Sequence, residues 1–253
     1  MRRFNRILET PKPRRSAVPA PLLKICGLRQ PEQAADIASL GVDAIGVIAV
    51  PGSPRWLPAA ERPALFAAMR AASPHCVGVL VCADPQDDDL AELEPHHGHG
   101  VIQLHGAESP ERCDQLRRRF GCPVWKAIRL RQPRDRATLD AYAGAVDAVL
   151  LDAWVADQLG GTGHRIPLDW LEGWQPPLPW WLAGGITAPR ATAVLQQLSP
   201  TGLDASSGVE RAPGDKDLVK VRALLSAVRD AGQPTGNPPV GDPPVGDPNV
   251  GLP

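Results

Sequence analysis

The residues LLKICGLRQPEQAADIASLGVDAIGVI, at positions 22 to 48, hold two short apolar runs with a segment of helical character between them. The runs, Leu22–Cys26 and Ala44–Ile48, are rich in Val, Ile and Leu, as buried strands of a parallel sheet are. The segment between them, Pro31–Leu40, begins with proline at the first helical turn, where a missing N–H costs nothing. This order predicts a strand, a helix and a second strand, which is the repeating unit of α/β folds.

The same alternation continues along most of the chain. Further apolar runs predict strands at Val77–Val81, Val101–Leu104, Val124–Ile128, Ala148–Leu151, Trp180–Ala183 and Leu203–Ala205. Further helices are expected at Pro58–Ala71, Pro110–Phe120, Pro189–Leu198 and Asp217–Val228. Strand–helix alternation repeated eight times in one domain predicts a (β/α)8 TIM barrel, with an open doubly wound sheet as the alternative.

The two ends of the chain differ in composition from its middle. Residues 1–20 are basic and hold three prolines without a sustained apolar period, which predicts a disordered arm. Residues 233–253 repeat the pentapeptide PPVGD, and proline every few positions prevents both a helix and a central strand. We therefore expect residues 21–232 to form the barrel, between two flexible extensions.

Composition excludes several classes of protein. The 253 residues carry 27 Lys and Arg against 28 Asp and Glu, a net charge of −1, which is unlike the basic field that nucleic-acid binding needs. No apolar run approaches the roughly 18 to 20 residues that span a bilayer, and no apolar region follows the first arginines as in a secretory signal. Five cysteines at irregular spacing fit reduced thiols. We expect a cytoplasmic protein without a membrane or nucleic-acid partner.

Two features bear on metal binding. The chain has no CxxC motif, which disfavours a thiolate zinc site. The cluster of His96, His97 and His99 has no carboxylate or cysteine at ligand spacing, so we interpret it as an ordinary exposed loop. No metal site is expected.

In a (β/α)8 barrel the chemistry lies where strands end and the following loops begin. The loops after the seventh and eighth strands contain glycine and serine, and their backbone N–H groups can approach a phosphate closely. The phosphate-binding candidates are Gly184, Gly185, Ser206, Ser207 and Gly208. Ordinary tight turns are the alternative interpretation.

Cys26 and Asp152 end strands on opposite sides of the predicted barrel mouth and form a candidate acid–base pair. Lys24 points to the same side of its strand as Cys26, where its charge favours the thiolate. Arg55 follows the second strand, and a guanidinium at the mouth suits bidentate binding of a planar carboxylate.

Two further features are expected near the mouth. Gln103 and His105 end the fourth strand, where we favour hydrogen-bonding roles that orient the substrate or support the site. The loop Gly160-Gly-Thr-Gly163 lacks the Lys and Ser or Thr of a P-loop, so we expect a mobile flap.

Seven motifs, in order along residues 22 to 230, resemble the phosphoribosylanthranilate isomerase family. They are Lys24-Ile-Cys-Gly-Leu-Arg29, Ser53-Pro-Arg55, Gln103-Leu-His-Gly106, Leu151-Asp152, Gly160-Gly-Thr-Gly163, Ala183-Gly-Gly-Ile186 and Asp204-Ala-Ser-Ser-Gly-Val-Glu210. The resemblance implies a barrel enzyme of tryptophan biosynthesis that needs no cofactor and takes a small phosphosugar as substrate. We expect a monomer or a homodimer.

The resemblance also implies a reaction, the conversion of N-(5-phosphoribosyl)anthranilate to 1-(2-carboxyphenylamino)-1-deoxyribulose 5-phosphate. By that similarity Cys26 is the general base, Asp152 the general acid and Arg55 the anchor of the anthranilate carboxylate. One acid and one base suffice for this Amadori rearrangement, because the substrate's own iminium accepts the electrons. Cys26 must be ionised to act, so we expect a lowered pKa for its thiol.

The sequence departs from the family at Gly46–Val50, which is aliphatic where members often have aromatic residues. Two other functions remain open. One is a related phosphosugar isomerase or epimerase, although barrel isomerases that do this chemistry with two aspartates lack the Cys26 of this pair. The other is an inactive barrel that serves as a binding scaffold, against which the intact Cys26, Asp152 and Arg55 argue.

Overall fold

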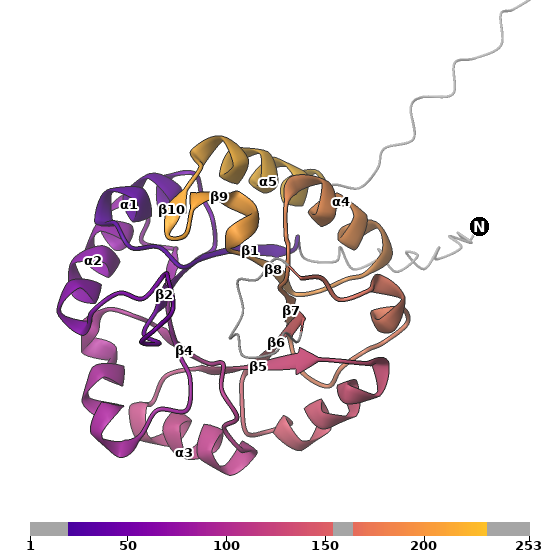
Figure 1. Cartoon of the computed structure of the whole chain (residues 1–253), viewed down its shortest axis with the longest axis horizontal. Coiled ribbons are helices and arrows are strands. Elements are labelled where there is room, and N and C mark those ends of the chain that lie inside the picture. The colour runs from indigo at the N-terminus through magenta and orange to yellow at the C-terminus, as the bar shows by residue number, and fades with distance from the viewer. Residues whose placement is uncertain (1–19, 154–163, 232–253) are drawn as a thin grey trace, which may run out of the picture.

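The computed structural model describes residues 20–153 and 164–231, and eight parallel strands there form a closed barrel (Figure 1). The strands are β1 (Leu22–Cys26), β2 (Ala44–Ile48), β3 (Val77–Cys82), β4 (Val101–Leu104), β5 (Val124–Leu130), β6 (Ala148–Ala153), β7 (Trp180–Leu182) and β8 (Gly202–Ala205). The barrel closes because β8 pairs with β1, with Lys24 opposite Asp204. The predicted (β/α)8 barrel is confirmed, and the open sheet is excluded.

Helices surround the strands (Figure 1). The α-helices are α1 (Pro31–Ser39), α2 (Arg62–Ala72), α3 (Pro110–Phe120), α4 (Ala188–Gln197) and α5 (Leu218–Ala231), and a 3₁₀ turn, η1 (Ala59–Glu61), precedes α2. All five helices predicted by residue range are confirmed, but the expected eightfold alternation is irregular after β3, β5 and β6. In the described residues those connections hold 3₁₀ segments, which are η2 (Asp87–Leu93), η3 (Pro95–His97), η4 (Pro133–Tyr142) and η5 (Leu168–Leu171).

The physical reason is the lack of an apolar face, from which most helices in proteins draw their stability. In the ten residues of η4 the buried side chain is Leu139. Asp89 and Asp135 instead accept backbone hydrogen bonds at the starts of η2 and η4, which favours short capped turns.

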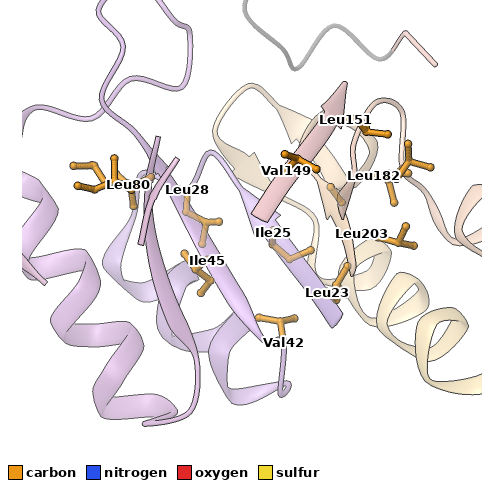
Figure 2. Close-up of a cluster of buried hydrophobic side chains, with 14 of the residues drawn as sticks. Leu23, Ile25, Leu28, Val42, Ile45, Leu80, Val149, Leu151, Leu182 and Leu203 are labelled. Atoms are coloured by element: carbon orange, nitrogen blue, oxygen red, sulfur yellow. The ribbon is translucent and has the colours of Figure 1, made fainter. Parts of the chain in front are cut away.

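The core has two parts, set by the alternation of side chains along each strand. One set, which includes Leu23, Ile25 and Ile45, packs outward against the helices (Figure 2). The inward set is smaller, and Trp125 and Trp181 fill part of the lumen with ring centroids 4.8 Å apart. The inward positions near the strand ends carry the polar residues of the site.

A small hairpin lies between β8 and α5, which the sequence pattern did not predict. It consists of β9 (Glu210–Ala212) and β10 (Asp215–Lys216), after the 3₁₀ turn η6 (Ser207–Val209). Gly214 makes its turn with a φ of 82°. The hairpin brings Glu210 and Lys216 into the interior, where both are buried.

Several expectations concern residues outside the described ones: the arm up to residue 19, the tail after 231 and the loop Gly160–Gly163. In the described part of the chain, no helix has the length and apolar character needed to cross a membrane. The same residues contain no group of three His, Cys, Asp or Glu side chains that could hold a metal ion. The histidine cluster is not simply an exposed loop, because His99 is buried and burial lowers its pKa to about 4.

Candidate active site

Cys26 ends β1 and faces the barrel interior beside Lys24. Gly46 on β2 provides the space for both, since a Cβ there would lie 2.7 Å from Cys26 Sγ and 3.0 Å from Lys24 Cε. Lys24 is fully buried, and its Nζ donates to Asp204 Oδ2 on β8 and to Gln103 Oε1 on β4, both at 3.0 Å. Lys24 therefore places a positive charge close to the thiol.

Asp152 lies on β6, and the side chains of Gln103 and His105 lie between it and Lys24. Because Gln103 accepts from Lys24 through Oε1, its amide nitrogen faces His105 Nδ1 at 3.3 Å. That nitrogen of His105 must accept, which puts the ring proton on Nε2, 3.6 Å from Asp152 Oδ2. We call this set the polar row: Asp204, Lys24, Gln103, His105 and Asp152.

Several buried polar atoms at this end of the barrel lack a partner. Of five such side-chain atoms in the described residues, three lie here: His105 Nε2, Asp204 Oδ1 and Ser206 Oγ. A buried polar atom without a partner costs about 1–3 kcal/mol, which a bound polar ligand can recover. Their position at the ends of β4 and β8 is where barrel enzymes bind their substrates.

Arg55 reaches from the loop after β2 across the end of β1. Its Cδ lies against Gly27, where a Cβ would come within 2.5 Å of it. Arg55 Nε and Nη2 donate to the two carboxylate oxygens of Glu210, at 2.8 and 2.7 Å. Nη1 is the guanidinium nitrogen that Glu210 does not use.

The glycine-containing loops after β7 and β8 lie against each other. A Cβ on Gly208 would lie 2.0 Å from the carbonyl oxygen of Ile186, so a side chain cannot be accommodated there. Gly184 and Gly185 both have positive φ, 88° and 60°. These conformations bring the two backbones close together beside Ser206 and allow close approach of a ligand, as phosphate binding requires.

The expectation of a lowered pKa for the Cys26 thiol is wrong. Burial raises its pKa above the ordinary value, and this outweighs the opposing effect of the Lys24 charge. For Lys24, burial alone would lower the pKa, but the adjacent Asp204 carboxylate more than offsets it and the net shift is upward. The lysine therefore stays charged, and the resting cysteine is a thiol.

The family model described as "N-(5'phosphoribosyl)anthranilate (PRA) isomerase" matches residues 23–227. The chain belongs to this family. The N-(5'-phosphoribosyl)anthranilate isomerase of Thermosynechococcus vestitus is 45% identical over 215 residues, which cover 83% of this chain and 91% of that protein. The crystal structure of phosphoribosyl anthranilate isomerase from Thermus thermophilus matches with a TM-score of 0.70 and 34% identity, over 83% of this chain and 98% of that one.

As a phosphoribosylanthranilate isomerase, the protein is an enzyme of tryptophan biosynthesis that converts N-(5'-phosphoribosyl)anthranilate to 1-(2-carboxyphenylamino)-1-deoxyribulose 5-phosphate. The structure brings most of the predicted site residues to the ends of the barrel strands. Lys24 and Gln103 are 0% and 1% exposed, so they lie beneath this surface with their polar atoms engaged in the polar row. Their predicted contact with the substrate stays a prediction.

Sequence reasoning gave no role to three residues of this phosphoribosylanthranilate isomerase site. Asp204 and Glu210 stand in a quoted motif, and Lys216 stands outside it. Asp204 pairs with Lys24 on the neighbouring strand, and Glu210 pairs with Arg55 and Lys216. The turn residues Pro213-Gly214 were the available signal for the hairpin that carries Glu210 and Lys216.

Proposed function

We propose that Cys26 and Asp152 carry out the isomerisation as general base and general acid. The observation that supports this most strongly is their placement at the ends of β1 and β6 on the inner side of the barrel. Lys24 lies beside Cys26 and hydrogen-bonds Gln103, which contacts His105, and His105 Nε2 lies 3.6 Å from Asp152 Oδ2. An acid and a base that act on neighbouring atoms of one substrate must both face it in a fixed geometry.

Asp152 acts first, on the ring oxygen of the ribose. Its proton moves to that oxygen, the bond from C1 to the ring oxygen breaks, and the amine lone pair forms a C1–N iminium. His105 Nε2, 3.6 Å from Asp152 Oδ2 and without a partner of its own, can hydrogen-bond the carboxylate or the new hydroxyl.

The Cys26 thiolate acts second, on C2 of the opened sugar. It takes the C2 proton, and the C–H electron pair becomes the C1–C2 double bond as the iminium electrons return to nitrogen. The enolamine then loses its hydroxyl proton and gains a proton at C1, which gives the ketone. The electrons stay within the substrate, so no oxidant or reductant is consumed.

The remaining predicted residues would hold the substrate. Gly184, Gly185, Ser206, Ser207 and Gly208 would bind its phosphate, and Arg55 its anthranilate carboxylate. A phosphoribosyl anthranilate isomerase of the same fold, 23% identical with a TM-score of 0.69 over 83% of this chain and 99% of that one, has been solved with reduced 1-(o-carboxyphenylamino)-1-deoxyribulose 5-phosphate. That compound carries both groups and is a suitable probe here.

Turnover of freshly prepared phosphoribosylanthranilate by the purified full chain tests the assignment, followed by the loss of anthranilate fluorescence. A two-aspartate type of sugar isomerase would not depend on the Cys26 thiol, and a binding scaffold would show no turnover. The protein is expected in the cytoplasm, as a monomer or a homodimer, and sedimentation of the purified chain would distinguish these two states.

Replacing Arg55 with Ala should raise KM for phosphoribosylanthranilate with a smaller effect on kcat. The lost contact is the ion pair between Arg55 and the substrate carboxylate. This pair forms in a site that excludes most water, so its removal costs on the order of 2–5 kcal/mol of binding free energy. Steady-state kinetics measure this split. An unchanged KM in a folded variant would move the carboxylate anchor to another residue.

The dependence of kcat/KM on pH should have an alkaline limb above the ordinary thiol pKa of about 8.5. In the reactive form Asp152 is protonated and Cys26 is a thiolate. Cys26 and Asp152 together must therefore hold one proton. Because burial raises the pKa of Cys26, the pair keeps that proton to higher pH, and kcat/KM falls only when it is lost.

Alkylation by iodoacetamide provides the independent measurement. The rate at Cys26 should rise on the same limb on which kcat/KM falls, since only the thiolate reacts. Cys76 and Cys113 serve as internal controls, because burial raises their pKa to about 12. A limb below pH 8 in both measurements would contradict the raised pKa.

A further inference from the structure

We propose that Glu210 is a positioning residue for the isomerisation, which fixes the Arg55 guanidinium in the orientation that receives the substrate carboxylate. The proposal rests on the role assigned to Arg55 above and adds the group that controls it. Nothing in the sequence pattern assigned Glu210 a role.

The contact between the two residues is specific in geometry. Both carboxylate oxygens of Glu210 accept from Arg55, through Nε at 2.8 Å and Nη2 at 2.7 Å. Arg55 is 7% exposed and Glu210 8%, so water competes little for these bonds. Two parallel charge-assisted bonds fix the plane of the guanidinium as well as its position.

Glu210 is itself held from other sides. Its Oε1 also accepts from Lys216 Nζ at 2.5 Å and from the backbone N–H of Gly214 at 3.0 Å. Its carbonyl oxygen accepts from Lys220 Nζ at 2.8 Å. We call this arrangement the Glu210 clamp: Glu210, Lys216 and the Gly214 N–H. The hairpin β9–β10 thus holds the Glu210 carboxylate in a fixed position beside Arg55.

The base of the clamp is anchored in α1. The backbone N–H of Lys216 donates to Gln33 Oε1 at 3.1 Å, and Gln33 Nε2 donates to Asp215 Oδ1 at 2.6 Å. Lys216 is fully buried. The clamp therefore connects the site to the helical layer and does not depend on a loose surface loop.

Charge in the clamp favours an anionic ligand. Burial would raise the pKa of Glu210, but hydrogen bonds from Arg55 and the charge of Lys216 outweigh it and lower the pKa. The ionised Glu210 thus offsets one of two buried basic groups, Arg55 and Lys216. Burial lowers the pKa of Lys216, and the Glu210 carboxylate opposes that shift and favours the charged form. A substrate carboxylate on Arg55 Nη1 would balance the second, close to Cys26 at the end of β1.

Among the described residues, the aliphatic part of the Arg55 side chain has little to hold it in place other than the Glu210 clamp. It lies across Gly27, whose missing Cβ would come within 3.3 Å of Ser206 Oγ as well as 2.5 Å of Arg55 Cδ. Without Glu210 the long side chain is no longer held across Gly27 and can turn into solvent. Its charge would remain, but the orientation needed for the carboxylate would be lost.

The test is the variant Glu210→Gln in the full-length enzyme, which keeps the size of the side chain and one acceptor. We expect KM for phosphoribosylanthranilate to rise on the order of tenfold, with kcat changed by less than about threefold. The dissociation constant of the reduced product analogue, measured by calorimetry, should rise in parallel. The same analogue without its carboxylate should bind both enzymes equally.

A double-mutant cycle shows whether Glu210 acts through Arg55. In an Arg55→Ala background, Glu210→Gln should change KM by less than about twofold, because the group it positions is gone. Equal losses for both analogues, additive effects in the cycle, or an unchanged KM in a folded Glu210→Gln enzyme would overturn the proposal.

Two further variants separate positioning from stability. Glu210→Gln leaves Lys216 buried without its partner, so if the variant fails to fold, the double variant Glu210→Gln with Lys216→Met is measured instead. Glu92→Gln is the matched control, since Glu92 pairs at 2.9 Å with the buried Arg62 at the start of α2. It should lower Tm without raising KM.

Kinetic measurements distinguish an error in the positioning role of Glu210 from an error in the assigned function. If the wild-type chain did not turn over phosphoribosylanthranilate, the assigned function would fail. If the wild type is active and Arg55→Ala raises KM while Glu210→Gln does not, only the positioning role of Glu210 fails.

Discussion

Replacing Cys26 with Ala should lower kcat on the order of a thousandfold, within the range that general acid–base groups contribute. The thiolate removes a C–H proton in the transition state and forms no strong contact in the ground state. The affinity for the reduced product analogue should therefore stay within about threefold of the wild type. Stopped-flow fluorescence with phosphoribosylanthranilate and calorimetry with the analogue measure the two quantities.

Cys113→Ala is the matched control for this prediction. Cys113 is fully buried on α3, away from the strand ends, so its replacement removes a buried thiol from the outer core alone. It should lower the free energy of unfolding and leave kcat/KM near the wild-type value. Equal losses of turnover and of analogue binding in Cys26→Ala would mean that Cys26 holds the substrate and does not act as the base.

Replacing Asp152 with Asn should have an effect of similar size on kcat, also on the order of a thousandfold. The amide keeps the size of the side chain and can still accept the hydrogen bond that Asp152 Oδ1 receives from the N–H of Ala153 at 2.9 Å. It cannot deliver a proton to the ring oxygen. Ring opening should then become the slowest step, which single-turnover kinetics would detect.

The shape of the substrate provides the control for Asp152→Asn. An analogue whose sugar is already open bypasses the step that needs the acid, so the variant should process it far better than the natural substrate. If both compounds were impaired equally, Asp152 would not act in ring opening. His105, the neighbouring polar group in the row, would then be the next candidate for the acid.

Much of this site could be predicted because strand ends are visible in a sequence. The apolar runs before Cys26 and Asp152 located both residues at the barrel mouth, since parallel strands end on one side. The barrel itself followed from eight such runs. The five helices predicted by residue range are all present, as α1 to α5. No range was predicted for a helix after β3, β5 or β6, and the described residues there form 3₁₀ segments.

What could not be predicted depends on contacts between distant residues. The partner of Lys24 is Asp204, 180 positions away, and the partner of Arg55 is Glu210, 155 positions away. The pKa of Cys26 was expected to fall because Lys24 stands two residues before it. The predicted direction of this pKa shift was wrong, because the effect of burial outweighs that of one nearby charge. The alternation of residues along a strand shows which side chains face inward, but it does not show how deeply each is buried.

The closure of β8 on β1 also has a consequence for how the enzyme is made. Ribosomes release β1 first, yet Lys24 and Arg55 have no acidic partner in the site until Asp204 and Glu210 have been synthesised. Contacts between the two ends of a chain form late, because their loop must close first. A nascent or proteolysed chain that stops before residue 216 therefore lacks part of the site. The isomerase activity of this protein in a cell extract is expected to come only from chains that extend past residue 216 and have closed the barrel.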